Sequence, residues 1–297
     1  MFTGPPRYVD GLPRPGRALV MGVLNVTPDS FSDGGRYLDR ASAVEHGLRL
    51  AAEGADLVDV GGESTRPGAD RPSTAEEADR VVPVVEALSS RGVTVSVDTM
   101  RASVAAAAVD AGAALVNDVS GGRADEDMLG TVAGLGTPYV LMHWRAHSRR
   151  MQEHTEYGDV VHDVVEELRE QLAAALRAGI DPGRIAVDPG IGFSKTADQN
   201  WGVLGGLERL HGLGQPLLVA TSRKRFLGAL LVDAEGNLRA PQQREDATIA
   251  TSALAAAAGA WCIRVHAVRG TLDAVRVAVR WAQGSTQGSR STAGARG

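Results

Sequence analysis

The chain alternates short apolar, often β-branched runs with longer stretches in which apolar residues recur at helical spacing. Eight apolar runs are expected to be strands, at residues 18–26, 56–60, 93–99, 114–119, 139–144, 185–188, 216–222 and 262–266. Amphipathic stretches follow them at 40–53, 74–90, 101–111, 125–135, 159–178, 198–210, 244–258 and 271–282. Strands that alternate with helices of this length form parallel sheets, and eight such units close a barrel. The pattern therefore predicts an α/β fold, a single-domain (β/α)8 TIM barrel.

Domain limits and loops follow from the same pattern. Residues 1–17 are expected to form an N-terminal extension, residues 18–284 the barrel domain, and residues 285–297, rich in Gly, Ser, Thr and Arg, a disordered tail. The strand-to-helix loops 27–39 and 61–73 are long, and long loops often serve as lids or binding loops. Both leave the carboxyl end of their strands, so we expect them to close over a site there.

A polar or charged residue closes each predicted strand. These strand ends are Asn25, Asp59, Asp98, Asn117, His143, Asp188, the trio Ser222, Arg223 and Lys224, and Arg264 with His266. Barrels of this type carry their chemistry at the carboxyl ends of their strands. Side chains two residues apart share a face of a strand, so Ser96 and Asp98 are expected to face the barrel interior. The valines beside them, Val95 and Val97, are expected to meet the helices.

Three of the strand ends would form a cluster of hydrogen-bond acceptors at the barrel mouth: Asp98, Asn117 and Asp188. Buried carboxylates are costly unless they are paired or hydrogen-bonded, so their natural partner is a ligand with several N–H groups. Each of the three can instead cap the following helix or bind loop amides, as Asp and Asn often do. All three together, with Lys224 opposite, favour a shared binding site.

The last two strands are predicted to give the mouth a cationic side. It comprises Arg264 and His266 together with Ser222, Arg223 and Lys224. Guanidinium and ammonium groups suit a multiply charged oxyanion, and barrels often bind phosphate at this position. Only two of the 31 Lys+Arg residues are lysines, which gives Lys224 added weight.

Three other residues allow both a structural and a functional interpretation. Taken alone, Asn25 is a turn residue, but beside a phosphate site its amide oxygen is a candidate ligand for Mg2+, which prefers oxygen atoms and shares substrate phosphates. His143 is interpreted as an ordinary strand-end histidine, because no partner for it can be read from the sequence. Cys262, the single cysteine, lies in an apolar strand and is expected to be a core residue.

Composition narrows the class of protein. With 297 residues, 43% hydrophobic and 23% charged, the chain has the composition of a soluble protein, and it lacks an apolar run of the roughly 18 residues that a membrane helix needs. A net charge of -5 and the lack of a basic stripe argue against nucleic acid as a partner. The N-terminal residues have no secretory h-region, so a cytoplasmic location is expected.

Seven segments resemble one known family. They are MGVLNVTPDSFSDGG at 21–35, DVGGESTRPG at 59–68, VDT at 97–99, VNDVSGG at 116–122, DPGIGF at 188–193, SRKRFLG at 222–228 and RVH at 264–266. Through them the region 18–283 is similar to the dihydropteroate synthases, the pterin-binding sulfonamide targets of folate synthesis. One small departure is Ala220, where the family more often has glycine.

The resemblance implies a reaction, a cofactor and a set of site residues. The family condenses 6-hydroxymethyl-7,8-dihydropterin pyrophosphate with 4-aminobenzoate, giving 7,8-dihydropteroate and pyrophosphate, with Mg2+ as the cofactor. Carried over to this chain, the pterin would be held by Asp98, Asn117, Asp188 and Lys224, and Arg264 would stack on its ring. The pyrophosphate and Mg2+ would be faced by Arg264, His266, Asn25 and Thr65. The aminobenzoate pocket would be shaped by Phe31, Pro67, Ser222 and Lys224, with Arg66 and Phe193 as further substrate contacts.

The resemblance also implies a mechanism, with Asp98, Lys224, Arg264 and His266 as the catalytic residues. Mg2+, Arg264 and His266 would stabilise charge on the departing pyrophosphate, and the neutral arylamine would attack without a strong base. The segments 31–33 and 66–68 look ordinary for the family, so inhibition by sulfonamides is predicted. A homodimer formed through late helices is expected. The small residues at 250–260 agree with it, although they could equally pack against the chain's own barrel.

Two other functions are compatible with a pterin-binding barrel. A methyltetrahydrofolate-dependent corrinoid methyltransferase would keep the acceptors but does not need Asn25, Arg264 and His266, so their presence disfavours it. A non-catalytic paralogue would show damaged motif positions, and none is found. Such a paralogue would still retain pterin in calorimetry while forming no product.

Overall fold

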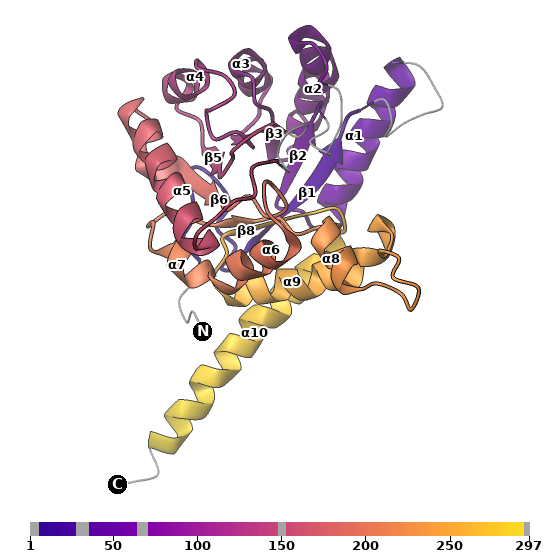
Figure 1. Ribbon diagram of the computed structural model, residues 1–297. Coiled ribbons are helices and arrows are strands. Elements are labelled where there is room, and N and C mark those ends of the chain that lie inside the picture. Colours follow the sequence, from indigo (N-terminus) through magenta and orange to yellow (C-terminus); the bar gives the residue numbers. More distant parts are fainter. Residues whose placement is uncertain (1–5, 28–35, 64–70, 148–152, 294–297) are drawn as a thin grey trace.

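The computed structural model describes residues 6–27, 36–63, 71–147 and 153–293, in which parallel strands alternate with helices (Figure 1). The strands are β1 (Leu19–Asn25), β2 (Leu57–Gly61), β3 (Val95–Asp98), β4 (Leu115–Asp118), β5 (Tyr139–Met142), β6 (Ile185–Asp188), β7 (Leu218–Val219) and β8 (Cys262–Val265). The helices are α1 (Arg36–Ala52), α2 (Thr74–Ser89), α3 (Ala102–Asp110), α4 (Met128–Leu135), α5 (Val160–Arg177), α6 (Ala197–Gly205), α7 (Leu207–His211), α8 (Arg225–Leu230), α9 (Glu245–Ala257) and α10 (Val268–Ala293), with short 3-10 helices η3 (Pro182–Arg184) and η4 (Pro241–Arg244). This arrangement confirms the predicted single-domain (β/α)8 barrel. No helix in the described ranges is long and apolar enough to span a membrane.

The strands form one parallel sheet in the order β6-β5-β4-β3-β2-β1-β8-β7. A bridge between Val187 and Leu217 joins β6 to the segment before β7, so the barrel closes. The register pairs Asn25 with Gly61, Gly61 with Asp98, and Asp98 with Asn117. Because these pairs stand level, the polar ends of β1, β3 and β4 reach the same rim.

Side-chain alternation gives the barrel two separate apolar cores. Val95 and Val97 belong to the outer core, between the strands and the helices, while Leu57, Leu115 and Cys262 belong to the inner one. Ser96 lies on the inner side and is fully buried. The predicted division of strand β3 into a valine face and a polar face is therefore confirmed, and so is the core position of Cys262.

The N-terminal segment closes the lower end of the barrel. Val9 is 0% exposed and Leu12 6% exposed, and both pack in the inner core. The backbone N–H of Asp10 donates to the carbonyl of Gly183, just before β6. These residues come from the segment that was expected to be an extension, and they plug the barrel base from below.

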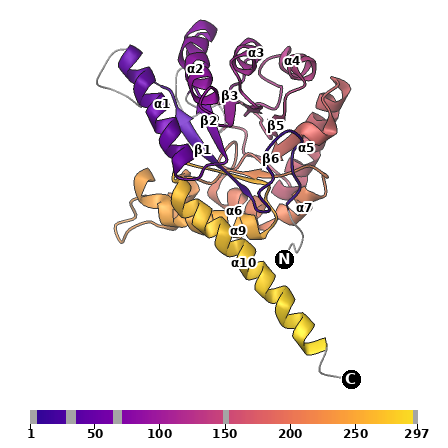
Figure 2. The same cartoon turned by 180° about the vertical axis from the view of Figure 1, so that it is seen from behind.

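Two predicted elements differ near the end of the chain. The strand expected at 216–222 is reduced to the two residues of β7, and Arg223, which takes a left-handed conformation (φ 59°), turns the chain into α8. Helix α10 continues to residue 293, through most of the expected tail, and projects beyond the barrel (Figure 2). Extending an existing helix fixes one residue per hydrogen bond, which is far easier than starting a new helix.

Candidate active site

The structure gathers most of the predicted site residues at the carboxyl rim of the barrel. Asn25, Asp98 and Asp188 are the last residues of β1, β3 and β6, and Asn117 and Arg264 lie in β4 and β8. Ser222 and Lys224 follow β7, and His266 follows β8. The expected contacts Phe31, Thr65, Arg66 and Pro67 lie outside the described residues, as do most of the two long loops that carry them.

Arg264 is the centre of the cluster. Its Nε donates to Oδ2 of Asp59 at 2.6 Å, and its Nη2 donates to Oδ2 of Asp98 at 2.7 Å. Burial alone would lower the pKa of Arg264, but the charges of Asp59 and Asp98 raise it overall. The guanidinium therefore stays charged, and two carboxylates fix the plane in which it lies.

Asp59 has a larger role than its place at a strand end predicted. The side chain is fully buried, and its Oδ2 also accepts from Nδ2 of Asn117 at 3.0 Å. This contact orients the amide of Asn117, because its N–H2 group faces Asp59 and its carbonyl oxygen is left to accept elsewhere. The alternation of side chains along β2 could have indicated that Asp59 points into the barrel, since Leu57 and Asp59 share the inward face of this strand.

Burial disfavours the ionised forms of Asp98 and Asp188, the two other carboxylates of the cluster. Burial raises the pKa of Asp98, and although the Arg264 charge opposes this shift, the nearby charge of Asp59 adds to it. Burial also raises the pKa of Asp188, against the charge of Lys224 and a hydrogen bond of 2.7 Å from the N–H of Gly190. A ligand that donates N–H groups to these carboxylates would stabilise their ionised forms.

Lys224 faces the acceptors from the other side of the mouth. Its Nζ donates to the carbonyl of Ile191 and lies 5.0 Å from the ring centroid of Phe193. Burial lowers the pKa of Lys224 to about 8, with the charge of Asp188 raising it and that of Arg264 lowering it further. Phe193, an expected substrate contact, is therefore close to Lys224.

An apolar group that the sequence did not reveal lies beside the acceptors. Met100, Val119 and Met142 are buried together, and Phe193 and Trp144 pack against them. Met100 lies two residues after the end of β3, Val119 directly follows β4, and Met142 ends β5. Apolar side chains next to buried acceptors are typical of a pocket for a flat, nitrogen-rich ring.

His266 is held by Ser222, as a pair on the cationic side. The Oγ of Ser222 lies 2.8 Å from Nδ1 of His266 and accepts from the backbone N–H of His266 at 3.2 Å. Arg223 does not join this side, because its Nε donates to Glu245 at the start of α9. The prediction that Arg223 belongs to this side was therefore wrong, and the basic side chains that the structure gathers here are Arg264, His266 and Lys224.

Asn25 is the one predicted metal ligand. It closes β1 beside Gly61, its side chain is partly exposed, and its amide oxygen is the hard ligand type that Mg2+ prefers. Within the described ranges, no group of three or more His, Cys, Asp or Glu side chains gathers around a point that could hold a metal. The amide oxygen of Asn25 fits a Mg2+ ion that completes its shell with water and substrate phosphate.

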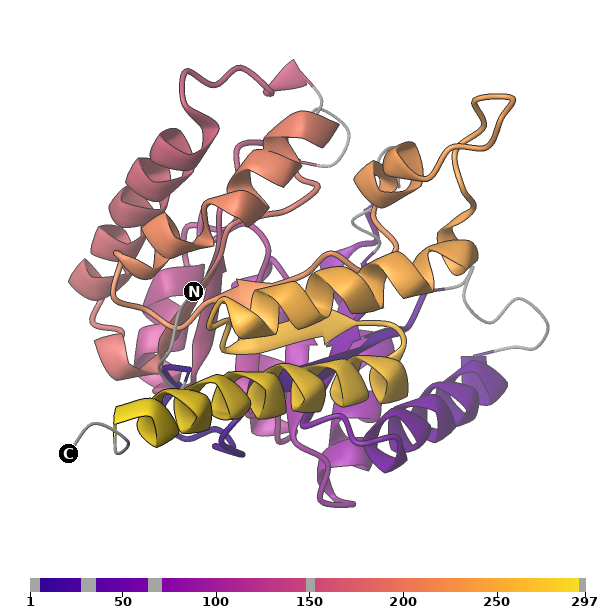
Figure 3. The same ribbon diagram turned by 90° about the horizontal axis from the view of Figure 1, so that it is seen from below.

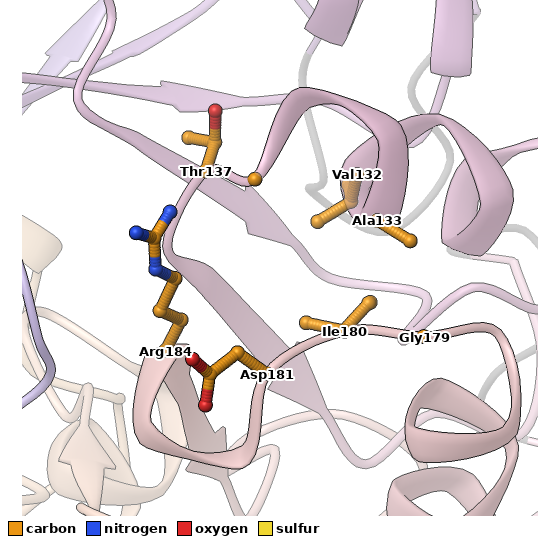
Figure 4. Close-up of a pocket in the computed structure, with 8 residues that line it drawn as sticks. Val132, Ala133, Thr137, Gly179, Ile180, Asp181 and Arg184 are labelled. Atoms are coloured by element: carbon orange, nitrogen blue, oxygen red, sulfur yellow. The ribbon is translucent and has the colours of Figure 1, made fainter.

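A pocket at the other end of the barrel is not part of this site (Figure 4). It is lined by residues from the end of α4 and from the segments that precede β5 and β6, namely Val132, Ala133, Gly136, Thr137, Gly179, Ile180, Asp181 and Arg184. The Asp181 side chain accepts from the N–H of Gly183 and caps η3. Residues at this end of a barrel serve stability rather than chemistry.

Comparison with known proteins agrees with the geometry of the mouth. The family model of the pterin binding enzymes matches residues 21–266. The dihydropteroate synthase of Mycobacterium leprae is 54% identical over 269 residues, which cover 90% of this chain and 95% of the relative. That of Bacillus subtilis is 45% identical, with 85% of each chain covered.

Solved structures give the same result. A Xanthomonas albilineans dihydropteroate synthase with 4-aminobenzoic acid has a TM-score of 0.81 and 47% identity, covering 88% of this chain and 92% of that one. The same enzyme in complex with 7,8-dihydropteroate has a TM-score of 0.78 and 45% identity, with the same coverage of both chains. By sequence and by fold, the chain belongs to the pterin-binding enzyme family, among its dihydropteroate synthases.

Proposed function

We propose that the barrel mouth condenses 6-hydroxymethyl-7,8-dihydropterin pyrophosphate with 4-aminobenzoate, giving 7,8-dihydropteroate and pyrophosphate. The observation that carries this proposal is the buried acceptor set around Arg264, in a chain that is 54% identical to a dihydropteroate synthase. The acceptors suit the aminopyrimidine edge of a pterin, and the cationic side suits its pyrophosphate.

The pterin lies between the acceptors and the apolar group. Asp98, Asn117 and Asp188 accept from its ring nitrogens and amino group, and Lys224 donates to its carbonyl and ring nitrogen. The contacts of Arg264 support a stacked arrangement, because Nε and Nη2 are already bound to carboxylates. The guanidinium face is then left for the pterin ring, and Nη1, which has no hydrogen-bond partner among the described residues, is left for phosphate oxygen.

Charge stabilisation at the leaving group provides the main catalytic effect. Arg264 and His266 face the pyrophosphate, and Ser222 holds the imidazole of His266 in place. Asn25 lies on this side, the family resemblance assigns Thr65 to it as well, and bound Mg2+ would supply further positive charge there. The arylamine of 4-aminobenzoate attacks in its neutral form, so no strong base is needed. By the family resemblance, the aminobenzoate pocket would be shaped by Ser222 and Lys224 together with Phe31 and Pro67, which lie outside the described residues.

The direct test is product formation from the two substrates, with and without Mg2+. Dihydropteroate and pyrophosphate are expected in the presence of Mg2+, with a lower rate after chelation. Arg264→Ala and His266→Ala are expected to lose most of the turnover, whereas Arg177→Ala, an exposed residue at the end of α5, is a matched control. The absence of dihydropteroate under every condition would contradict the proposal.

The protein is further proposed to be a cytoplasmic homodimer that associates through α9 and α10, which pack side by side (Figure 3). The small residues Thr251, Ser252 and Ala255 are buried within the chain itself, as the alternative interpretation held. The outer faces of these helices expose larger apolar groups, with Leu254 at 70%, Val277 at 61% and Trp281 at 73%. Light scattering after gel filtration tests this, and a monomer at micromolar concentration would refute it.

A further inference from the structure

Lys195 is the second of the chain's two lysines, and the proposed reaction does not use it. It follows Ser194, whose φ of 48° turns the chain, and it is only 4% exposed. Its Nζ lies 3.0 Å from Nδ1 of His143 and 3.2 Å from the carbonyl oxygens of Gly190 and Phe193. An ammonium group has three N–H bonds, and these acceptors take all of them.

His143 is not an ordinary strand-end histidine, because it links Lys195 to a helix. Since Nδ1 accepts from Lys195, Nε2 carries the ring proton and donates to Oε2 of Glu167 in α5 at 2.9 Å. Arg145 binds the same carboxylate and packs over the Tyr157 ring at 3.7 Å. Burial and the Lys195 charge lower the pKa of His143 to about 4, so the ring is a neutral acceptor at neutral pH.

The loop that Lys195 holds, residues 188–193, supplies two of the proposed pterin contacts. A Cβ atom at Gly190 would lie 2.4 Å from the carbonyl oxygen of His143, so the loop is pressed against the end of β5. From the opposite side, Lys224 donates to the carbonyl of Ile191. The two lysines of the chain therefore bind neighbouring carbonyls of one loop.

We propose that Lys195 is a positioning residue of the pterin site, whose ammonium group holds the loop 188–193 in the shape that presents Asp188 and Phe193 to the pterin. This inference rests on the proposed placement of the pterin. The buried lysine does not reach the mouth itself, so it acts through the loop carbonyls. Without this donor, the carbonyl of Phe193 would be left unsatisfied, the carbonyl of Gly190 would keep only its bond from the N–H of Phe193, and the loop would shift.

The electrostatic surroundings of Lys195 make this hold dependent on pH. Burial lowers the pKa of Lys195 to about 7. The charges of Asp188 and Glu167 raise this pKa, and those of Lys224 and Arg145 lower it. The rings of His143 and Tyr157 also face the ammonium group. When pH rises through about 7, the ammonium loses a proton and its charge, and affinity for the pterin is expected to fall.

The test is steady-state kinetics of the wild type and Lys195→Met from about pH 6 to 9. The variant is expected to raise the KM for the pterin pyrophosphate on the order of 10-fold at the acid end, the effect of one charge-assisted hydrogen bond. Its kcat and its KM for 4-aminobenzoate should change far less. The rise of wild-type KM near pH 7 should be absent from the variant, which keeps the step near pH 8 that belongs to Lys224 and the acid limb that belongs to Asp98. An unchanged KM and pH profile would overturn the inference.

A second variant keeps the test decisive where Lys195→Met fails to fold. Glu167→Gln retains an acceptor for His143 but removes a charge that raises the pKa of Lys195. The KM at about pH 6 should stay near the wild-type value, and the rise of KM should move to lower pH. A rise at the wild-type pH in this variant would overturn the inference.

A control variant separates this inference from the proposed reaction. Arg184→Met removes a partly buried cation at the other end of the barrel and should leave the kinetics unchanged. A wild-type protein that forms no dihydropteroate would contradict the proposed function. An active wild type that Lys195→Met and Glu167→Gln match at every pH would contradict only the role of Lys195.

Discussion

Replacing Asp59 with asparagine removes a fully buried charge while leaving the shape of the side chain nearly unchanged. In the wild type, Oδ2 of Asp59 accepts from Nε of Arg264 at 2.6 Å and from Nδ2 of Asn117 at 3.0 Å. Removing one partner of a buried ion pair costs about 3–5 kcal/mol. Arg264 keeps Asp98 as a second partner, and its side chain is 20% exposed, so we expect a loss of roughly 2–3 kcal/mol in the free energy of unfolding.

The same change should weaken catalysis, because Asp59 orients two groups that contact the substrate. The amide of Asn117 can rotate, and the guanidinium of Arg264 can leave its plane. A loss of about 2.7 kcal/mol in transition-state binding corresponds to a fall on the order of 100-fold in kcat/KM for the pterin pyrophosphate. The pH profile should also move. The charge of Asp59 adds to the burial that raises the pKa of Asp98, so its removal lowers that pKa and shifts the acid limb of pterin binding to lower pH.

Asp56→Asn is the matched control for this experiment. Asp56 lies three residues earlier, where it pairs with Arg17 at 2.7 Å and accepts from the N–H of Val20 at 2.8 Å. Urea denaturation and steady-state kinetics of both variants separate stability from function. Asp56→Asn should lose stability with unchanged kcat/KM. If Asp59→Asn behaves in the same way, Asp59 serves the fold alone and the positioning argument is refuted.

Three further results are expected. Asp188→Asn should raise the melting temperature relative to wild type increasingly as pH rises above about 4, because burial raises the folded-state pKa of Asp188 and ionising it costs stability that asparagine does not lose; a constant difference across pH would contradict this. His266→Ala should lower kcat on the order of 100-fold, measured as pyrophosphate release, and Ser222→Ala less, since Ser222 holds the imidazole ring and does not itself face the pyrophosphate; equal effects would place Ser222 at the leaving group itself. Sulfonamides should inhibit in competition with 4-aminobenzoate, and full turnover at saturating sulfonamide would count against the predicted pocket.

The period-of-two alternation in the strands is the reason why the fold and the rim could be predicted. Because neighbouring side chains in a strand point to opposite faces, the sequence separates the outer valines of β3 from Ser96 and Asp98 inside. Parallel pairing then places all carboxyl ends at one rim. The residues at the mouth were therefore predictable as a set, without knowledge of which of them touch.

The contacts within that set were not predictable, because they cross the barrel. Arg264 lies 205 residues from Asp59 and 166 from Asp98, and the local sequence around each says nothing about the others. For Arg223, by contrast, the sequence predicted a place at the mouth that the structure does not confirm. It was grouped with Lys224 by sequence, but its left-handed backbone breaks the strand alternation and sends its side chain to Glu245. Tertiary packing, rather than any local sequence pattern, decides both the contacts of Arg264 and the direction of the Arg223 side chain.

The plug of Val9 and Leu12 at the barrel base has a consequence for the electrostatics of the mouth. With these two side chains in the inner core, apolar groups separate the barrel interior from bulk water at this end. Because the apolar base of the barrel excludes water, the effective dielectric constant near Asp59 and Arg264 stays low, which strengthens the attraction between them. A chain shortened to begin at Ala18 would admit water from below and weaken this pairing without altering a residue of the mouth. A tag joined to the N-terminal segment would lie at the base of the barrel, at the end opposite the substrate site.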